Sequence, residues 1–301
     1  MRLVIAGGTG FIGSALCARL IDQGHSLAIL THSPPPVTIS SGRTWAIWNP
    51  PESGPWREAV DGADGVINLA GEPIAARRWS AEQKHRIRLS RLDTTRALVA
   101  AIAGARKKPK FLLNSSAIGY YGPHGDETLT EEAGPGSDFL ARLCVDWETE
   151  TSKAEKLGLR VVRLRTGIVL GKGGGALAKM VPPFKLFIGG PLGSGKQWMS
   201  WIHMEDEIGL IQFLIEKPRA QGAINATAPN PVTMKEFCAT LGSVLRRPSW
   251  APVPGFALRL ILGEMAEMLL TGQRVIPAKA RKLGYKFRYP TLQEALQNLS
   301  L

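Results

Sequence analysis

Apolar residues in the first half of the chain alternate between short continuous runs and positions three or four residues apart. Leu3–Ala6 is a short apolar run, which predicts a buried strand, and Ile12, Leu16 and Leu20 then recur at the spacing of one helix face. Gly24 predicts the end of that helix. The same pattern predicts strands at Ser26–Leu30, Thr44–Trp48, Gly65–Ala70, Lys110–Asn114 and Arg160–Arg165, a helix reaching to about Ala105, and a helix from an N-cap at Ser137 to about Leu157.

Strands that alternate with helices predict a Rossmann-like α/β fold, in which a doubly wound parallel sheet carries helices on both faces. From Gly171 onward the pattern changes to glycine-rich loops and helices, with fewer strands. We therefore expect a dinucleotide-binding domain over residues 1–170 and a smaller α+β C-terminal substrate lobe over 171–301, interleaved with the sheet. The helices expected in this lobe are Met204–Glu216, Met234–Leu245 and Ala257–Leu270.

The turn after the first predicted strand carries three glycines at a fixed spacing. Gly7, Gly10 and Gly13 follow the strand directly and open the first helix. In such a motif the first glycine allows a tight turn, the second lets the backbone approach a pyrophosphate, and the third lets helix and strand pack closely. The turn therefore predicts a dinucleotide cofactor, bound by Gly7, Thr9, Gly10, Phe11, Ile12 and Gly13.

The end of the second predicted strand indicates which dinucleotide binds. Enzymes that use NAD usually place Asp or Glu there to bind the ribose 2′-hydroxyl. This chain has Thr31-His32-Ser33 followed by three prolines, so it offers hydroxyls and an imidazole in place of a carboxylate. A 2′-phosphate suits these groups better, and we predict that Thr31, His32 and Ser33 contact NADP.

Several further segments match one family. They are Asn68–Glu72 after the fourth strand, Arg78-Trp79, Ser90-Arg91, Ser116–Gly122, Trp147-Glu148, Gly189–Pro191, Trp201–His203, and a C-terminal run from Pro252 through Gly263–Met265 to Pro277. Together with the TGFIG sequence of the glycine turn, they make the whole chain resemble the atypical extended short-chain dehydrogenase/reductases of the NAD(P)-dependent epimerase family, which carry a C-terminal domain of unknown function. The resemblance implies an NADP-dependent oxidoreductase or epimerase that acts on a small carbonyl- or hydroxyl-bearing substrate.

The resemblance also implies cofactor contacts beyond the glycine turn. They come from the loop after the fourth strand, from the helix that follows it and from the segment after the sixth strand: Leu69, Ala70, Gly71, Arg86, Arg91 and Val169. Residues 171–203 are expected to form the rim of the substrate site. Extended members of the superfamily often dimerise through two helices, which implies a homodimer by analogy.

The catalytic pair of this superfamily, Tyr-x-x-x-Lys, is absent from the sequence. Its place in the helix falls on Cys144 and Glu148, and the catalytic serine is best matched by Ser116. Tyr120 and Tyr121 are candidates for the acid/base role, with Ser116 polarising a carbonyl.

Two alternatives to this assignment stay open. Cys144 is a possible proton donor or nucleophile, but Glu148 one turn away would raise the pKa of its thiol, and a buried helical cysteine is usually a small apolar residue. The other alternative is a non-catalytic protein that binds NADP and acts in redox sensing or regulation.

The composition describes a folded, basic chain. Its 301 residues are 44% apolar and 21% charged, which is sufficient for a core, and 37 Lys and Arg against 25 Asp and Glu give a net charge of +12. Residues 71–110 alone hold 11 cations against three acids. A nucleic-acid surface would interleave aromatic residues with these cations, but Trp79 is the only aromatic residue in that segment, so no nucleic-acid partner is expected.

Cysteines, histidines and apolar runs exclude several other classes. Three distant cysteines predict no disulfide framework, and five scattered histidines predict no metal site. No apolar run is long enough to span a membrane, and the apolar start of the chain is too short for a secretion signal. We expect a cytoplasmic protein that takes a small-molecule substrate and has no membrane partner.

Two segments of the C-terminal part allow more than one interpretation. Gly190–Lys196 fits the spacing of a phosphate-binding loop, but Gln197 stands where such a loop needs Ser or Thr, so a substrate-facing glycine loop is favoured. His203 and Asp206 lie at a predicted helix start, where they either orient a substrate or support the loop.

Overall fold

A seven-stranded parallel sheet forms the centre of the protein in the computed structural model, which describes residues 1–33 and 42–301. The strand order is β11-β7-β5-β4-β1-β2-β3, with all neighbouring strands parallel. The predicted Rossmann-like α/β fold is confirmed. The strands are β1 (Arg2–Ala6), β2 (Ser26–Thr31), β3 (Arg43–Ile47), β4 (Gly65–Asn68), β5 (Phe111–Ala117), β7 (Arg160–Thr166) and β11 (Gly222–Ala226).

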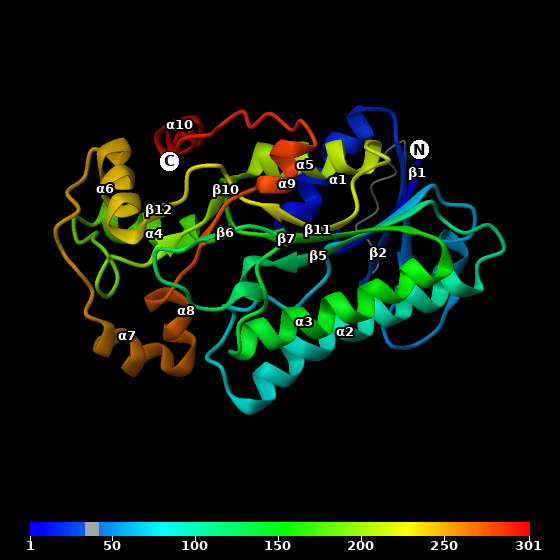
Figure 1. The fold of residues 1–301 in the computed structure, drawn as a ribbon, viewed down its shortest axis with the longest axis horizontal. Coiled ribbons are helices and arrows are strands. Elements are labelled where there is room, and N and C mark those ends of the chain that lie inside the picture. The colour runs from blue at the N-terminus through cyan, green and yellow to red at the C-terminus, as the bar shows by residue number, and fades with distance from the viewer. Residues whose placement is uncertain (34–41) are drawn as a thin grey trace.

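Alternate residues of β1 pack against different helices, as the two-residue period of a strand requires. Leu3 and Ile5 join a core with α1 (Phe11–Asp22) and α5 (Met204–Glu216), whereas Val4 packs in a core with α2 (Ala81–Gly104). On the α2 side lies α3 (Phe139–Ser152), which runs along α2 (Figure 1). Helices therefore cover both faces of the sheet.

A smaller lobe built mainly from the later part of the chain has its own apolar core, to which Trp201, Phe237 and Leu296 belong. It contacts the sheet through β8 (Ile168–Leu170), which pairs with β10 (Trp201–His203) just beyond the end of β7. Its other elements are α4 (Leu177–Lys185), β9 (Trp198–Met199), β12 (Val232–Thr233), α6 (Met234–Leu245), α7 (Gly255–Leu262), α8 (Glu267–Leu270) and α10 (Leu292–Asn298). Between α8 and α10, β13 (Arg274–Val275) pairs with β6 (Thr128–Leu129), and α9 (Ala278–Lys282) packs against β11 of the central sheet. No helix of the described chain is long and apolar enough to cross a bilayer.

Three expectations about individual elements are wrong. The N-cap of α3 is Asp138 and not Ser137, because the Asp138 carboxylate accepts the backbone N–H of Ala141 at 2.7 Å. The helix predicted over Ala257–Leu270 ends at Leu262, where Gly263 takes a φ of +61° and a short 3-10 turn separates α7 from α8. The sheet also gains β11, a seventh strand whose five residues carry no run of large apolar side chains.

Candidate functional site

The three glycines of the first turn are required by close backbone contacts. Gly7 has a φ of +79°, and a Cβ there would lie 2.6 Å from the carbonyl carbon of Leu69. A Cβ on Gly13 would lie 2.1 Å from the carbonyl oxygen of Gly7. Gly10 is the N-cap of α1 and donates its N–H to Gly7 O at 3.0 Å, and no side chain among the described residues caps the helix. The N-terminal amides of α1, with no acidic residue in the first turn, therefore fit the diphosphate of a dinucleotide.

The loop after β4 lies against this turn, while contact of Leu69, Ala70 and Gly71 with the cofactor stays a prediction. Leu69 and Ala70 are the backbone neighbours that a side chain on Gly7 would strike. Arg91 on α2 holds the loop in place, because its Nη1 donates to Glu72 O at 3.0 Å and to Ile87 O at 3.1 Å. The Arg91 guanidinium lies 5.2 Å from the ring centre of Trp147, and burial lowers its pKa.

The structure ties both arginines that were expected to reach the cofactor to groups of the chain itself. Arg91 is bonded to the loop backbone, so it shapes the wall of the cofactor site. Arg86 is 45% exposed, and its guanidinium bonds to Gln83 at 2.9 Å and faces Glu82 at 3.5 Å. Direct contact of either side chain with the cofactor stays a prediction.

The end of β2 presents the polar groups predicted to contact a 2′-phosphate. Thr31 Oγ1 donates to the carbonyl oxygen of Ser33 at 3.2 Å, which folds the segment into a tight turn. His32 is exposed, stacks on Trp48 at a ring separation of 6.3 Å and lies 3.3 Å from Asn49 Oδ1 through Nδ1. The three prolines that follow lie outside the described residues.

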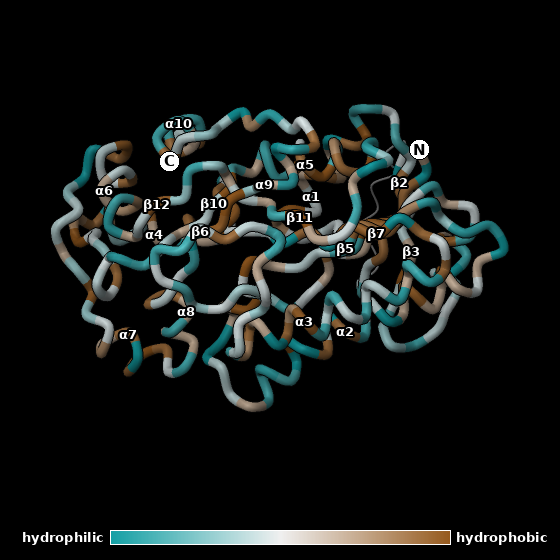
Figure 2. The backbone as a smooth tube through the Cα atoms, viewed as in Figure 1, coloured by the Kyte–Doolittle hydropathy of each residue, from teal (hydrophilic) through white to brown (hydrophobic). Residues whose placement is uncertain are grey.

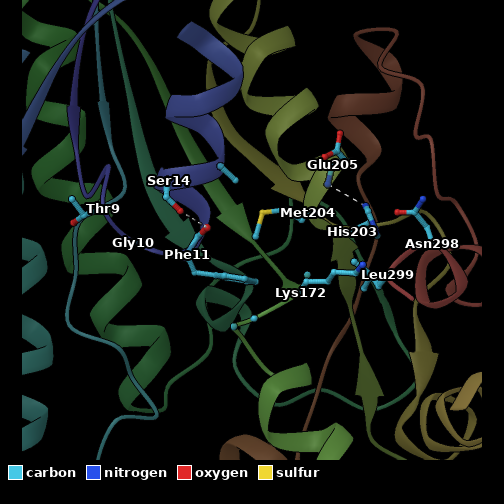
Figure 3. A pocket seen from close by; sticks show the side chains of 14 residues that line it. Thr9, Gly10, Phe11, Ser14, Lys172, His203, Met204, Glu205, Asn298 and Leu299 are labelled. Carbon is cyan, nitrogen blue, oxygen red and sulfur yellow. Dashed lines mark hydrogen bonds between the residues drawn. The ribbon is translucent and has the colours of Figure 1, made fainter. Parts of the chain in front are cut away.

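A pocket of about 890 Å³ opens beside the N-terminus of α1 (Figure 3). Figure 3 shows Phe11 on one side of it and Lys172 and His203 on the other. The ring of Phe11 packs against the Gly171–Gly175 loop, where side chains on three of the glycines would strike it. Val169, expected near the nicotinamide, is buried just before this loop. The pocket is lined by Thr9, Gly10, Phe11, Ser14, Ala15, Gly171, Lys172, Gly173, Gly174, His203, Met204, Glu205, Asn298 and Leu299.

A buried ion pair lies where the superfamily keeps its catalytic groups. Ser116, the next-to-last residue of β5, donates its hydroxyl to Glu148 Oε1 at 2.7 Å. Arg165 on β7 donates two hydrogen bonds to the same carboxylate, from Nε to Oε1 at 2.8 Å and from Nη2 to Oε2 at 2.9 Å. The side chains of Arg165 and Glu148 are only 5% and 11% exposed. The position of the missing lysine is thus filled by an acid that needs a cation of its own.

Both candidate tyrosines lie against Arg165. Tyr121 accepts a hydrogen bond from Arg165 Nη1 at 3.0 Å and donates its own proton to Asn225 Oδ1 at 2.7 Å. The Tyr120 ring centre is 3.4 Å from the Arg165 guanidinium carbon. The structure therefore gathers Ser116, Tyr120 and Tyr121 in one network.

Burial and charge set the protonation of this network. Burial alone would lower the pKa of Arg165, but the bonds to Glu148 outweigh it and raise that pKa above its usual range. Burial raises the pKa of Tyr121. Burial, reinforced by Glu148, raises the pKa of the Cys144 thiol to about 12. The thiol is therefore neutral at physiological pH, and Cys144 fits the interpretation as a small core residue better than that of a nucleophile.

A second cavity, of about 1220 Å³, reaches the network from the α3 side of the sheet. Tyr120, Glu148 and Arg165 line it, together with Lys279 at the start of α9. Tyr121 does not, because it is fully buried. Tyr120 is half-buried, and no hydrogen bond of its hydroxyl is found within the described ranges, so it is the member of the trio whose hydroxyl is available.

Sequence reasoning missed Arg165 and Asn225. Arg165 lies in a strand whose apolar residues predict burial, and an arginine at such a position itself signals a buried partner. Asn225 belongs to β11, which was not predicted. A second missed cluster joins Asn68, Thr95 and Asn114 beneath the carboxyl ends of β4 and β5, with bonds of 2.7–3.4 Å.

The structure shows which groups His203 and Asp206 contact. Asp206 is fully buried and accepts the backbone N–H groups of Arg288 and Tyr289 at 2.8 and 2.9 Å, so it fastens the C-terminal segment. His203 caps α5 by accepting the N–H of Glu205 at 3.1 Å, and its Nε2 has no partner in the part of the chain that is described. No group of potential metal ligands occurs among the described residues.

Carboxylates from other elements pair with five of the eleven cations of residues 71–110. Lys84, Arg88 and Arg96 bind carboxylates of η4 (Gly263–Ala266) and α3, and Arg106 and Lys110 bind those preceding β4. These five ion pairs therefore join the segment to other parts of the chain. The partners are Glu264, Asp146, Glu150, Asp61 and Asp64, respectively.

Comparison with known proteins agrees with this geometry. Residues 3–226 match the model of the NAD dependent epimerase/dehydratase family, and residues 253–299 match a domain of unknown function, DUF1731. The chain is 44% identical over 300 residues to the chloroplastic epimerase family protein SDR39U1 homolog of Arabidopsis thaliana, covering 99% of this chain and 86% of that protein. It is 40% identical to the epimerase family protein YfhF of Bacillus subtilis, covering 99% and 98%.

Solved structures show the same fold. The human epimerase family protein SDR39U1, crystallised with NADPH, superposes with a TM-score of 0.88 at 34% identity, covering 100% of this chain and 99% of that one. The UDP-glucuronic acid 4-epimerase of Bacillus cereus, crystallised with NAD, superposes with a TM-score of 0.79 at 16% identity, covering 100% and 96%, and at that identity it shows the fold alone.

Proposed function

Because the chain belongs to the NAD dependent epimerase/dehydratase family, we propose that it is an NADP(H)-dependent oxidoreductase or epimerase acting on a small carbonyl- or hydroxyl-bearing substrate. The observation that carries this proposal is the position of the Arg165 network relative to the glycine turn. A dinucleotide lies across the carboxyl ends of such a sheet, with its diphosphate at the β1–α1 turn and its halves over the strands on either side. Ser116 and Tyr120 stand at the end of β5, on the side away from Thr31–Ser33.

The cofactor is NADP(H). The human relative was crystallised with NADPH, and the end of β2 in this chain offers two hydroxyls and an imidazole where an NAD enzyme places a carboxylate. The bound cofactor supplies or accepts a hydride at nicotinamide carbon C4. The residues that would hold it are the amides of the glycine turn, the Leu69–Gly71 loop and Thr31–Ser33.

Hydride transfer to a carbonyl also needs a proton for the oxygen, and we assign that task to Tyr120. The Ser116 hydroxyl donates a hydrogen bond to Glu148, and the Tyr121 hydroxyl donates one to Asn225. Neither hydroxyl is therefore available as a proton donor to a substrate. The Arg165 cation at the ring face of Tyr120 stabilises negative charge that develops on the phenol. Arg165 would thus replace the missing lysine, with Ser116, Tyr121 and Glu148 as positioning residues.

The committed hydroxyls of Ser116 and Tyr121 also favour a second candidate function. A structural ion pair needs its neighbouring hydrogen-bond donors to be satisfied, as these two are. Such a network would be sufficient in a protein that binds NADP(H) without turnover. Redox sensing or regulation would then be the function.

The three cysteines are buried and unpaired, which supports a reducing compartment such as the cytoplasm for either candidate.

Two measurements test these proposals. Calorimetric titration with NADPH and NADH should show tighter binding of NADPH, and a preference for NADH would contradict the assignment of Thr31–Ser33. NADPH oxidation across a panel of carbonyl compounds and sugar nucleotides should fall at least about a hundredfold in Tyr120→Phe, which removes the acid. Tyr289→Phe is the matched control outside the network and should keep full activity. Tight NADPH binding without turnover on any substrate would favour the second candidate.

A further inference from the structure

Large apolar side chains are exposed almost entirely at one end of the C-terminal lobe. Of nine strongly exposed large apolar residues in the described chain, seven lie in a turn after α4, at one position after α6, and on α7. On α7, Phe256, Leu260 and Ile261 are 74%, 78% and 64% exposed. We call this set the C-lobe apolar patch: Leu186, Phe187, Ile188, Trp250, Phe256, Leu260 and Ile261.

The segments of the patch are physically joined. The indole N–H of Trp250 donates to Phe187 O at 3.0 Å, and the backbone N–H groups of Trp250 and Ala251 both bond to Gly189 O at 3.1 Å. The chain then passes directly into α7, five residues after Trp250. Figure 1 shows α4, α6 and α7 at the end of the molecule opposite β2 and the N-terminus, and Figure 2 shows the apolar colour of α7 there.

Every charged residue in these segments is a cation. Residues 182–189 and 245–262, which form the patch, contain no Asp or Glu and hold four cations: Lys185, Arg246, Arg247 and Arg259. Lys185 and Arg246 are exposed at the ends of α4 and α6, and Arg247 stacks on Phe187 at 4.5 Å. One further cation of the patch, Arg259 on α7, pairs with Glu267. The patch is therefore an apolar surface with a positive border.

We propose that the C-lobe apolar patch docks the protein on a membrane surface rich in anionic lipids. Exposed apolar side chains enter the boundary of the acyl chains, Trp250 suits the headgroup level, and the cations meet lipid phosphates. Each cation near an anionic surface strengthens binding about fivefold. This proposal replaces the expectation of no membrane partner, which rested on the absence of a spanning segment, because docking on a membrane surface needs no such segment. The inference is independent of the proposed function.

The charge pattern favours a lipid surface over a second copy of the chain. A two-fold dimer through this patch would bring two positive borders together, since both subunits present the same surface. Like charges facing each other across an interface oppose association. An anionic bilayer instead complements both the apolar centre and the positive border.

The full chain can be tested by flotation with phosphatidylcholine vesicles that contain or lack phosphatidylglycerol. We expect binding to the mixed vesicles, weakened by salt, and little binding to phosphatidylcholine alone. The double variant Phe256→Gln/Leu260→Gln should bind at least about tenfold more weakly, because two apolar side chains no longer enter the bilayer. Ile47→Gln, an exposed apolar position on β3 outside the patch, is the matched control and should bind as the parent chain does.

A second pair of variants separates local charge from net charge. Lys185→Gln/Arg246→Gln removes two cations of the border, and Lys107→Gln/Lys108→Gln removes two exposed cations before β5. We expect about twenty-five-fold weaker binding for the first pair, fivefold for each cation, and less than about a twofold change for the second. Unchanged melting temperatures establish that the variants fold. Should Phe256→Gln/Leu260→Gln melt early, Ile261→Gln takes its place.

Several outcomes would overturn the proposal. The first is equal binding to both kinds of vesicle. The second is an equal loss of binding in Lys185→Gln/Arg246→Gln and Lys107→Gln/Lys108→Gln. The third is full binding by Phe256→Gln/Leu260→Gln. Sedimentation gives one more: a dimer of the parent chain that the patch variant converts to a monomer, without vesicle binding, would identify a second copy as the occupant.

Discussion

The Glu148–Arg165 pair makes a quantitative prediction about stability. Glu148→Gln keeps the shape of the side chain but leaves the Arg165 guanidinium without its counter-charge. Because the two side chains are only 11% and 5% exposed, water from the cavity that they line replaces the lost carboxylate only in part. Removal of one partner of a buried pair costs about 3–5 kcal/mol, which lowers the melting temperature of a chain of this size by about 5–8 °C.

Scanning calorimetry of Glu148→Gln and Asp146→Asn provides the comparison. Asp146 lies on the same helix and pairs with Arg88, but these side chains are 44% and 45% exposed, so its substitution should cost less than about 1 kcal/mol. The double variant Glu148→Leu/Arg165→Met should be more stable than Glu148→Gln is, because it leaves no unpaired charge. If Glu148→Gln melts no earlier than Asp146→Asn does, the reasoning about the buried network is refuted.

Three further predictions concern the glycine turn, a buried acid and the cysteines. Gly13→Ala should weaken NADPH binding at least about tenfold in calorimetry, because its Cβ would lie 2.1 Å from Gly7 O, while Gly125→Ala meets no atom within 4 Å and should be neutral. Burial raises the pKa of Glu207 from 4.5 to about 8, so the folded chain keeps a proton that the unfolded chain has lost. The free energy of unfolding should therefore fall as pH rises from about 4.5 to about 8, and Glu207→Gln should flatten the profile of melting temperature against pH. Cys144, whose pKa is raised to about 12, should react with a thiol reagent at least about a hundredfold more slowly in the native chain than in denaturant, and rapid native labelling would contradict its burial.

Local patterns predicted the sheet and the glycine turn well, because both depend on neighbouring residues. The apolar runs from Leu3 to Arg165 fall on six strands of the central sheet, and Gly7 and Gly13 face the backbone contacts that their motif requires. β11 was missed because its five residues owe their strand conformation to β7, some 60 residues earlier, and not to their own apolarity.

The candidate site was less predictable, since its geometry depends on distant partners. Arg91 was expected to reach the cofactor, but the carbonyl oxygens of Glu72 and Ile87 bind its guanidinium. Ser116 was expected to polarise a carbonyl, yet its hydroxyl donates to Glu148, 32 residues later. No local pattern indicates that the acid in the lysine position would be neutralised by Arg165, because that contact forms only when α3 packs on β7.

The place of β11 in the sheet bears on how the chain is made. A ribosome must deliver residue 226 before the seventh strand can join, and the segment between β7 and β11 contributes β8, α4 and β10 to the other lobe. Until then β7 is an open sheet edge, to which a second nascent chain could add a strand. The two lobes are therefore not modules that can be exchanged or expressed separately by cutting near residue 170. A fragment ending there would expose that edge and lack Asn225, the acceptor for Tyr121.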